Sequence, residues 1–359
     1  MPLLTRQLKI KRIGFQDWKG EIKMKSKTAV LLVNLGTPDS PAPKDVYKYL
    51  IEFLTDGRVI TKPWGIRQLL VRGLIVPLRY RQSAKSYGEI WLKEGSPLMV
   101  HSKNTKKLLQ ENLGSEYIVE LAMRYQNPAI KNVIQNIMKN KVDHLIVVPL
   151  FPQYASATTG SVHQEIMKII SSFEVIPKLT LVNNFATNPL YIETIADIAS
   201  TYKLECYDHY LFSFHGLPSS HLTKANPSCM QSKDCCKATC ATNQGCYKAE
   251  CLATAHAIAA KLKLDPSSYS ISFQSRLGKD PWIEPFTINT IKELRKKDAK
   301  RILVFCPSFV SDCLETIHEI GIEYAEEFIK EGGEALHYVK SLNDHPKWIA
   351  ALRSIVKNA

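Results

Sequence analysis

The fold is easiest to predict from one stretch of the chain, Leu211-Phe212-Ser213-Phe214-His215-Gly216-Leu217-Pro218. Its first residues are apolar and of types that favour β-strands, and Gly216 and Pro218 then end the strand. In α/β proteins, ligands bind at the carboxyl ends of parallel strands. The stretch therefore predicts a buried parallel strand that presents His215 at a functional edge of a sheet.

A second strand of the same kind, residues 301–306, is followed by a helical pattern that carries acidic residues. Asp312, Glu315 and Glu319 are spaced i, i+3 and i+7, which predicts that they share one face of the helix. Histidine titrates near neutral pH, and both imidazole and carboxylate bind divalent metal ions. The two strand ends therefore indicate a site that handles protons, a metal ion, or both.

Strand and helix patterns alternate along the chain. Continuous apolar runs predict buried strands at residues 28–35, 117–122, 144–149, 179–182, 210–214, 269–273 and 302–306. Patterns with one charged face predict helices at residues 46–54, 102–111, 129–139, 163–172, 191–204, 247–262, 287–297 and 314–331. Apolar strands that alternate with helices predict an α/β protein with doubly wound parallel sheets.

The two halves of the chain resemble each other. Residues 32–38 resemble 212–218, residues 119–124 resemble 271–276, and residues 144–151 resemble 301–309. Because the pairs occur in the same order, we predict two similar Rossmann-like domains, residues 28–183 and 184–359, with the active-site cleft between them. Residues 1–27 are predicted to be a basic N-terminal tail, and residues 226–245 a cysteine-rich insert in the second domain.

The chain is basic, with 47 Lys and Arg against 34 Asp and Glu in 359 residues, a net charge of +13. Residues 62–85 contain six basic side chains and no acidic one, interleaved with apolar residues. Such a mixture favours contact with an anionic membrane surface or an amphiphilic acid, although an amphipathic helix with a solvated basic face gives the same pattern. Nucleic-acid binding is not supported, because no recognition motif accompanies the basic stretch.

No apolar run reaches the roughly 18 residues that a membrane-spanning helix needs. Residues 1–27 hold eight Lys or Arg and no apolar core, which is not the pattern of a secretory signal. We therefore expect a cytoplasmic protein, with peripheral attachment to a membrane surface through residues 62–85. The same pattern disfavours a periplasmic ligand-binding protein, whose two-lobed outline would be similar.

Longer motifs resemble those of the ferrochelatase family. They occur in order at residues 32–38 (LVNLGTP), 87–98, 123–125 (MRY), 152–160, 213–218 (SFHGLP), 274–282 and 312–316 (DCLET). The resemblance implies two Rossmann-like domains and the insertion of ferrous iron into protoporphyrin IX. In that reaction two pyrrole protons are released and protohaem is formed, as the last step of haem synthesis.

The resemblance also implies roles for particular residues. His215 and Glu315 are expected to face each other in the cleft as catalytic residues and Fe²⁺ ligands, with Glu319 one helical turn further on or else facing solvent. Which of the first two binds iron and which accepts protons stays open. Residues expected to border the porphyrin are Leu35, Trp91, Arg124, Tyr125, Tyr154, Ser275 and Trp282. For Arg124, a propionate contact and a structural salt bridge are both open.

Six of the nine cysteines lie within residues 229–251. Dense cysteines in a cytosolic enzyme indicate a metal site rather than disulfides. Four thiolates suit a 2Fe–2S cluster or a tetrahedral zinc ion, and some members of the family carry a 2Fe–2S cluster, which favours the first. Free thiols are the remaining alternative. The predicted ligands are Cys229, Cys236, Cys240 and Cys246, with Cys235 and Cys251 as alternates.

Two other functions remain open. If the cleft is rich in basic residues, the same insertion of iron would use coproporphyrin, which has four carboxylates, as its substrate. A haem-binding or iron–sulfur protein that lacks turnover would have the same fold, but it would not need both His215 and Glu315. A monomer and a homodimer are equally compatible with the sequence.

Overall fold

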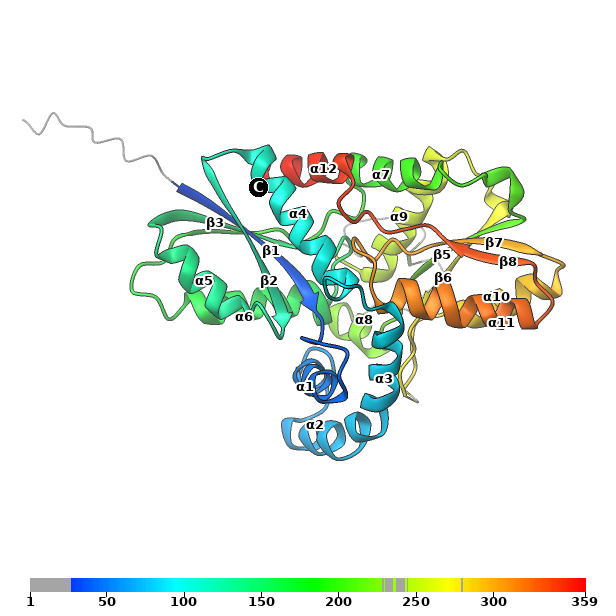
Figure 1. Cartoon of the computed structure of the whole chain (residues 1–359), viewed down its shortest axis with the longest axis horizontal. Coiled ribbons are helices and arrows are strands. Elements are labelled where there is room, and N and C mark those ends of the chain that lie inside the picture. The colour runs from blue at the N-terminus through cyan, green and yellow to red at the C-terminus, as the bar shows by residue number, and fades with distance from the viewer. Residues whose placement is uncertain (1–26, 228, 230–234, 237–242, 244, 279) are drawn as a thin grey trace, which may run out of the picture.

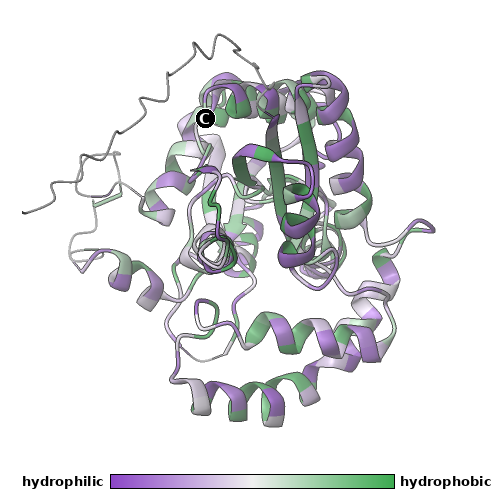
Figure 2. Ribbon diagram, turned by 90° about the vertical axis from the view of Figure 1, so that its left-hand side faces the viewer, coloured by the Kyte–Doolittle hydropathy of each residue, from purple (hydrophilic) through white to green (hydrophobic). Residues whose placement is uncertain are grey.

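The computed structural model describes residues 27–227, 229, 235–236, 243, 245–278 and 280–359. These residues form two four-stranded sheets in which every pair of neighbouring strands is parallel (Figure 1). Figure 2 shows the strands as largely hydrophobic and the outer faces of the helices as hydrophilic. The predicted α/β class with parallel sheets is confirmed.

The first sheet has the strand order β2-β1-β3-β4. Its strands are β1 (Lys27–Gly36), β2 (Tyr117–Tyr125), β3 (Val142–Pro149) and β4 (Lys178–Leu181). Val30 and Leu32 pack on the side of α4 (Pro97–Leu113), whereas Leu31 and Val33 pack on the side of α5 (Ile130–Met138) and α6 (Ser161–Ile170). Both faces of β1 are buried, which explains why its apolar run does not alternate with polar residues.

The second sheet repeats that order as β6-β5-β7-β8. Its strands are β5 (His209–His215), β6 (Tyr269–Gln274), β7 (Arg301–Phe305) and β8 (Ala335–Tyr338). One face packs with α7 (Pro189–Ala199) and α9 (Tyr247–Lys261), and the other with α10 (Thr287–Lys296) and α11 (Ala325–Lys330). The equal strand orders agree with the internal resemblance of the two halves.

Several elements were missed by the sequence analysis. Strand β8 is only four residues long and has one buried residue, so it gives no apolar run. Other missed elements include α2 (Trp64–Leu70), the π-helices η1 (Val71–Ile75) and η2 (Ser156–Gly160), α3 (Val76–Ile90), α8 (Ser219–Ala225) and α12 (Pro346–Lys357). Helices α2 and α3 project from the first sheet beside α1 (Pro43–Leu54), where few apolar side chains mark a buried face (Figure 1).

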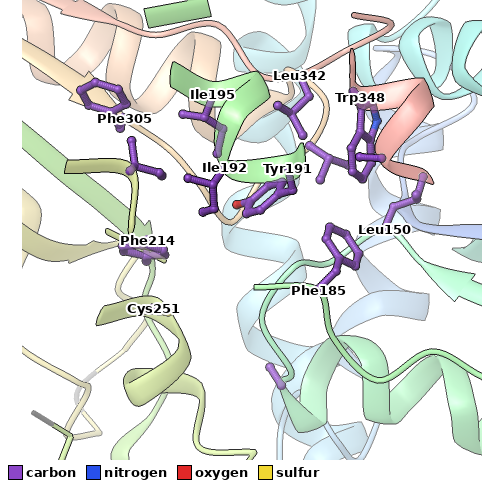
Figure 3. Packing of buried hydrophobic residues seen from close by; sticks show 14 of the residues in the cluster. Leu150, Phe185, Tyr191, Ile192, Ile195, Phe214, Cys251, Phe305, Leu342 and Trp348 are labelled. Carbon is purple, nitrogen blue, oxygen red and sulfur yellow. The ribbon is translucent and has the colours of Figure 1, made fainter. Parts of the chain in front are cut away.

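The C-terminal helix α12 joins the two halves. It lies beside α4 of the first half and α7 of the second (Figure 1). Its Trp348 is fully buried and packs against Phe185 and Tyr191, with ring centroids 5.5 and 6.4 Å away (Figure 3). Large aromatic side chains contribute much of the stability of such a core. The two halves therefore share one continuous hydrophobic cluster.

Candidate functional site

His215 is the last residue of β5 and is half-buried. Its Nδ1 lies 2.6 Å from the carbonyl oxygen of Gly216, which only accepts hydrogen bonds, so Nδ1 carries the proton and the lone pair is on Nε2. Two contacts fix its backbone: the Tyr247 hydroxyl donates to the His215 carbonyl (2.7 Å), and the His215 N–H donates to Ser308 Oγ (3.4 Å). The strand thus presents an imidazole whose Nε2 can accept a proton or bind a metal ion.

Glu315 lies in a π-helix, η6 (Leu314–Tyr324), where the sequence analysis predicted one continuous α-helix to residue 331. π-Helices are rare and are frequently found at functional sites. The Glu315 side chain is half-buried near the hydroxyls of Tyr49 and Tyr87. Burial raises the pKa of Tyr49 well above its usual value, and the negative charge of Glu315 raises it further. Glu315 therefore lies beside two buried phenols whose raised pKa values keep them neutral.

Glu319 is held by four hydrogen bonds, so the alternative that it faces solvent is wrong. Its carboxylate accepts from the Ser275 N–H (2.8 Å), Ser275 Oγ (2.5 Å), the Tyr324 hydroxyl (2.8 Å) and Gln274 Nε2 (3.2 Å). Gln274 is paired with His215 in the register of β5 and β6. Glu319 and His215 therefore lie at the same edge of the second sheet.

Asp312 does not belong to the predicted row of carboxylates. It precedes Cys313, the N-cap of η6, and it is buried. Its carboxylate accepts hydrogen bonds from Asn343 Nδ2 (2.8 Å), the Ser341 N–H (3.1 Å) and Thr316 Oγ1 (3.1 Å). The prediction that Asp312 shares a helical face with Glu315 and Glu319 is wrong, because Asp312 precedes the helix and its oxygens accept from Thr316 and from the loop before α12.

Arg124 and Tyr125 end β2 and share one buried carboxylate, that of Asp56. Asp56 Oδ2 lies 2.8 Å from Arg124 Nη2, 2.9 Å from the Tyr125 hydroxyl and 2.5 Å from Ser161 Oγ. Burial tends to raise the pKa of Asp56, but hydrogen bonds from Ser161 and the Arg58 N–H and the charge of Arg124 hold it below the usual value. The salt bridge that the sequence left open is present, and the propionate contact stays a prediction.

Three of the predicted porphyrin contacts lie in one apolar cluster. Leu35, Trp91 and Tyr125 pack there with Leu314 and Ile317 of η6. Residues of the first half therefore pack against the helix of the second half that carries Glu315. This proximity is not evident from the sequence, because the five residues come from β1, β2, η6 and the segment after α3.

Trp282 and Tyr154 lie near the residues that follow His215. Trp282 packs against Gly216, where an added Cβ would be 3.1 Å from the indole ring. Tyr154 lines a cavity of about 70 Å³ together with Leu217 and Tyr247. Both aromatic residues are half-buried. Tyr247, whose hydroxyl fixes the backbone of His215, was missed because its position at the start of a helix carries no distinctive pattern.

The described cysteines of the insert lie close together. Cys229, Cys236 and Cys246 are buried, and the sulfurs of Cys235 and Cys236 are 3.5 Å apart. Burial and then the neighbouring Cys246 and Cys235 raise the pKa of Cys229 to about 11. Within the described ranges, no three His, Cys, Asp or Glu side chains form a metal site. The predicted ligand Cys240 lies outside the described residues.

The surface of residues 62–85, which we call the lip, exposes large apolar side chains. The exposed fractions of Trp64, Leu69 and Leu78 are 71%, 77% and 74%. Among its basic residues, Arg67 is half-buried, and its guanidinium donates to backbone carbonyls in the segment before α2. No helix in the described part of the chain has the length and hydropathy to span a bilayer.

Comparisons with known proteins bear on the family and the fold of this chain. The ferrochelatase family model matches residues 27–359. The ferrochelatase of Bdellovibrio bacteriovorus is 42% identical over 92% of this chain and 99% of its own length. That of Legionella pneumophila is 42% identical over 92% and 98%. Among solved structures, SirB from Bacillus subtilis with Fe³⁺ is similar in fold, with a TM-score of 0.54, 12% identity, and coverage of 92% and 95% of the two chains.

We predict that Asp56→Asn lowers the free energy of unfolding by about 3 kcal/mol at pH 7, because it leaves the Arg124 guanidinium without its charged partner. The pKa of Asp56 is lower in the folded protein than in the unfolded chain. Its carboxylate therefore stabilises the fold above the unfolded pKa of about 3.9, and this contribution is lost as the pH falls through the folded pKa. Urea unfolding of both proteins between about pH 3 and 8 should show the difference shrinking at low pH; a constant difference would contradict the prediction.

Proposed function

The chain belongs to the ferrochelatase family and inserts ferrous iron into a porphyrin in haem synthesis, and we propose that this porphyrin is protoporphyrin IX. The proposal is supported by the surroundings of the site. The residues expected to border the macrocycle are mainly apolar or aromatic, and Arg124 is already paired with Asp56. Coproporphyrin, with four carboxylates, would need more unpaired basic side chains.

We assign the chemistry to His215 and Glu315. The observation that carries this assignment is the amide of Gln274, which lies beside His215 in the sheet and donates to the backbone carbonyl of Glu315 (3.2 Å). Metallation removes two N–H protons from the porphyrin as Fe²⁺ enters the ring. The Nε2 lone pair of His215 and the carboxylate of Glu315 supply the two kinds of group that this requires, a base and an anionic oxygen ligand.

Glu319 has a different role in this proposal. Its oxygens already accept hydrogen bonds from Ser275 and Tyr324, so it anchors η6 to the end of β6. An anchored carboxylate still contributes negative charge beside the site. Loss of that charge is expected to affect turnover less than loss of Glu315.

We predict that His215→Ala abolishes iron insertion but leaves porphyrin binding largely intact. Glu315→Gln should lower kcat by at least about a hundredfold, and Glu319→Gln by less. Anaerobic protein is mixed with Fe²⁺ and protoporphyrin IX, and loss of porphyrin fluorescence is followed together with haem absorption.

His337→Ala is the matched control, because His337 is exposed. Normal turnover in His215→Ala would refute its assigned role, and tight porphyrin binding without turnover in the wild-type protein would favour a binding protein. The same assay with coproporphyrin compares the two substrates. A higher kcat/KM for coproporphyrin would overturn the choice of protoporphyrin IX.

We also propose a 2Fe–2S cluster held by four cysteines of residues 229–251. The support is chemical: buried thiols gather where the chain has no other evident use for them. The predicted ligands are Cys229, Cys236, Cys240 and Cys246, with Cys235 and Cys251 as alternates. The described sulfurs alone do not make a site, so the proposal needs Cys240. When bound, such a cluster supplies one-electron redox chemistry, and no step of iron insertion depends on it.

We predict that the anaerobically purified protein is brown, with visible absorption that Ser at Cys229, Cys236 or Cys246 abolishes. Cys206→Ser is the control, because Cys206 is exposed and lies outside the insert. A colourless protein that contains zinc would favour the zinc alternative. A colourless, metal-free and active protein would overturn the cluster proposal and would mean that these cysteines bind no metal.

The lip is proposed to attach a cytoplasmic enzyme to an anionic membrane surface. Its exposed apolar side chains can enter the headgroup region, while the adjacent basic side chains contact anionic lipids.

We further propose a domain boundary near residue 183, since β4 ends at Leu181 and β5 begins at His209. Monomer and homodimer both remain compatible with this arrangement.

We predict that the protein sediments with vesicles that contain anionic phospholipid, and that binding weakens as salt is raised above about 0.15 M. Leu69→Ser combined with Leu78→Ser should reduce binding, because it removes two exposed apolar contacts. Val175→Ser is the control, since Val175 is 80% exposed but outside the lip. Equal binding by all three proteins would contradict the assignment of the lip.

A further inference from the structure

We infer that Glu250 is a positioning residue that holds the Tyr154 loop of the first half against the strand end that carries His215. This inference rests on the proposed roles of Tyr154 and His215. Glu250 lies on α9 in the second half and only 9% of it is exposed. A buried carboxylate is costly to keep unless its oxygens are hydrogen-bonded, so its partners identify what it does.

Both partners of Glu250 come from outside the second sheet and its helices: Tyr154 lies in the first half, and Asn184 lies at the predicted boundary between the halves. Oε2 accepts a hydrogen bond from the Tyr154 N–H (2.7 Å), and Oε1 accepts one from Asn184 Nδ2 (2.8 Å), in the segment that follows β4. A carboxylate is suited to this position because each of its two oxygens accepts from a separate donor. An amide in the same place would have one acceptor oxygen, so it would accept from only one of those N–H donors.

The same helix also holds His215. Tyr247, three residues before Glu250, donates its hydroxyl proton to the His215 carbonyl (2.7 Å). Thr254, one turn after Glu250, accepts from Gln153 Nε2 (3.0 Å) and lies 2.8 Å from the Ala186 carbonyl, to which its hydroxyl donates. Consecutive turns of α9 therefore link the base proposed for the reaction to the loop that supplies an aromatic wall.

This linkage matters because a flat macrocycle must be held between the two. Tyr154 and Tyr247 both line the cavity of about 70 Å³ described above, so the loop has space to shift if its contact with Glu250 is lost. Small displacements of binding groups lower catalytic efficiency even when the reacting groups are intact. We expect loss of the contact to raise the KM for porphyrin more than it lowers kcat.

The test exchanges the hydrogen-bonding roles of the two side chains. Asn184→Asp places two carboxylates opposite each other, whereas Glu250→Gln alone keeps both contacts, because the Asn184 amide can turn its oxygen towards the new NH₂ group. In the double variant, the new amide at position 250 donates to the new carboxylate at position 184, while the amide oxygen still accepts from the Tyr154 N–H. Asn184→Asp should raise the KM for protoporphyrin IX by about five- to tenfold, whereas Glu250→Gln alone and the double variant should both stay within about twofold of wild type.

Assays are run at about pH 8.5, because burial raises the pKa of Glu250 to about 7 and the carboxylate is ionised there. Glu120→Gln, which alters a carboxylate that contacts Lys106 away from the site, is the control and should leave KM unchanged. A wild-type KM in Asn184→Asp would overturn the inference, as would a double variant no better than Asn184→Asp. If Asn184→Asp does not fold, recovery of soluble, active protein in the double variant still supports the pairing, and its absence overturns it.

These outcomes are separate from failure of the proposed function. Wild-type turnover and its loss in His215→Ala test the reaction itself. Porphyrin binding followed by fluorescence tests the position of the Tyr154 loop even without turnover. A wild-type protein that binds porphyrin but does not turn over would therefore still allow the exchange of roles to be scored from binding.

Discussion

The buried side-chain amide of Gln274 is the group on which the candidate site depends. Its oxygen accepts from Ser213 Oγ (2.7 Å), and its nitrogen donates to the Glu315 carbonyl and to the Glu319 carboxylate (both 3.2 Å). It therefore connects β5, β6 and η6 at the edge where His215 emerges. A buried amide that loses its partners costs about 1–3 kcal/mol, so this arrangement is strongly preferred over one in which η6 moves away.

The rest of the site depends on how the two halves are joined. Trp348 of the C-terminal helix packs with Phe185 and Tyr191 in a core common to both sheets (Figure 3). Nearer to His215, helix α9 reaches the first half through hydrogen bonds rather than through apolar contacts alone. An apolar interface holds the two halves together, whereas directional hydrogen bonds determine the positions of particular loops. Insertion of a small ion into a flat porphyrin requires such precisely positioned loops.

The charges of the protein are distributed unevenly with respect to this site. Arg124 is neutralised by Asp56, and Glu315 lies among buried phenols. Many of the basic residues of the lip are instead on its surface, next to exposed apolar side chains. A hydrophobic porphyrin with two acidic groups and an anionic membrane both match a surface of this kind. The site interior is therefore suited to binding a cation, and the lip to contact with an amphiphilic anion.

Local sequence determined seven of the eight strands, the parallel sheets, and the placement of His215 at the end of one strand and of Glu315 in the helical segment after another. Apolar runs and strand-breaking residues act over a few positions, so these features need no knowledge of distant contacts. Only the tertiary structure decided that Arg124 is paired with Asp56, that Asp312 faces the loop before α12, that Glu319 is an anchor, and that Glu250 reaches the first half. Each of these contacts joins residues that are far apart in the chain. The sequence shows which side chains are charged or polar, but only the packing of the folded chain decides which partner each one meets.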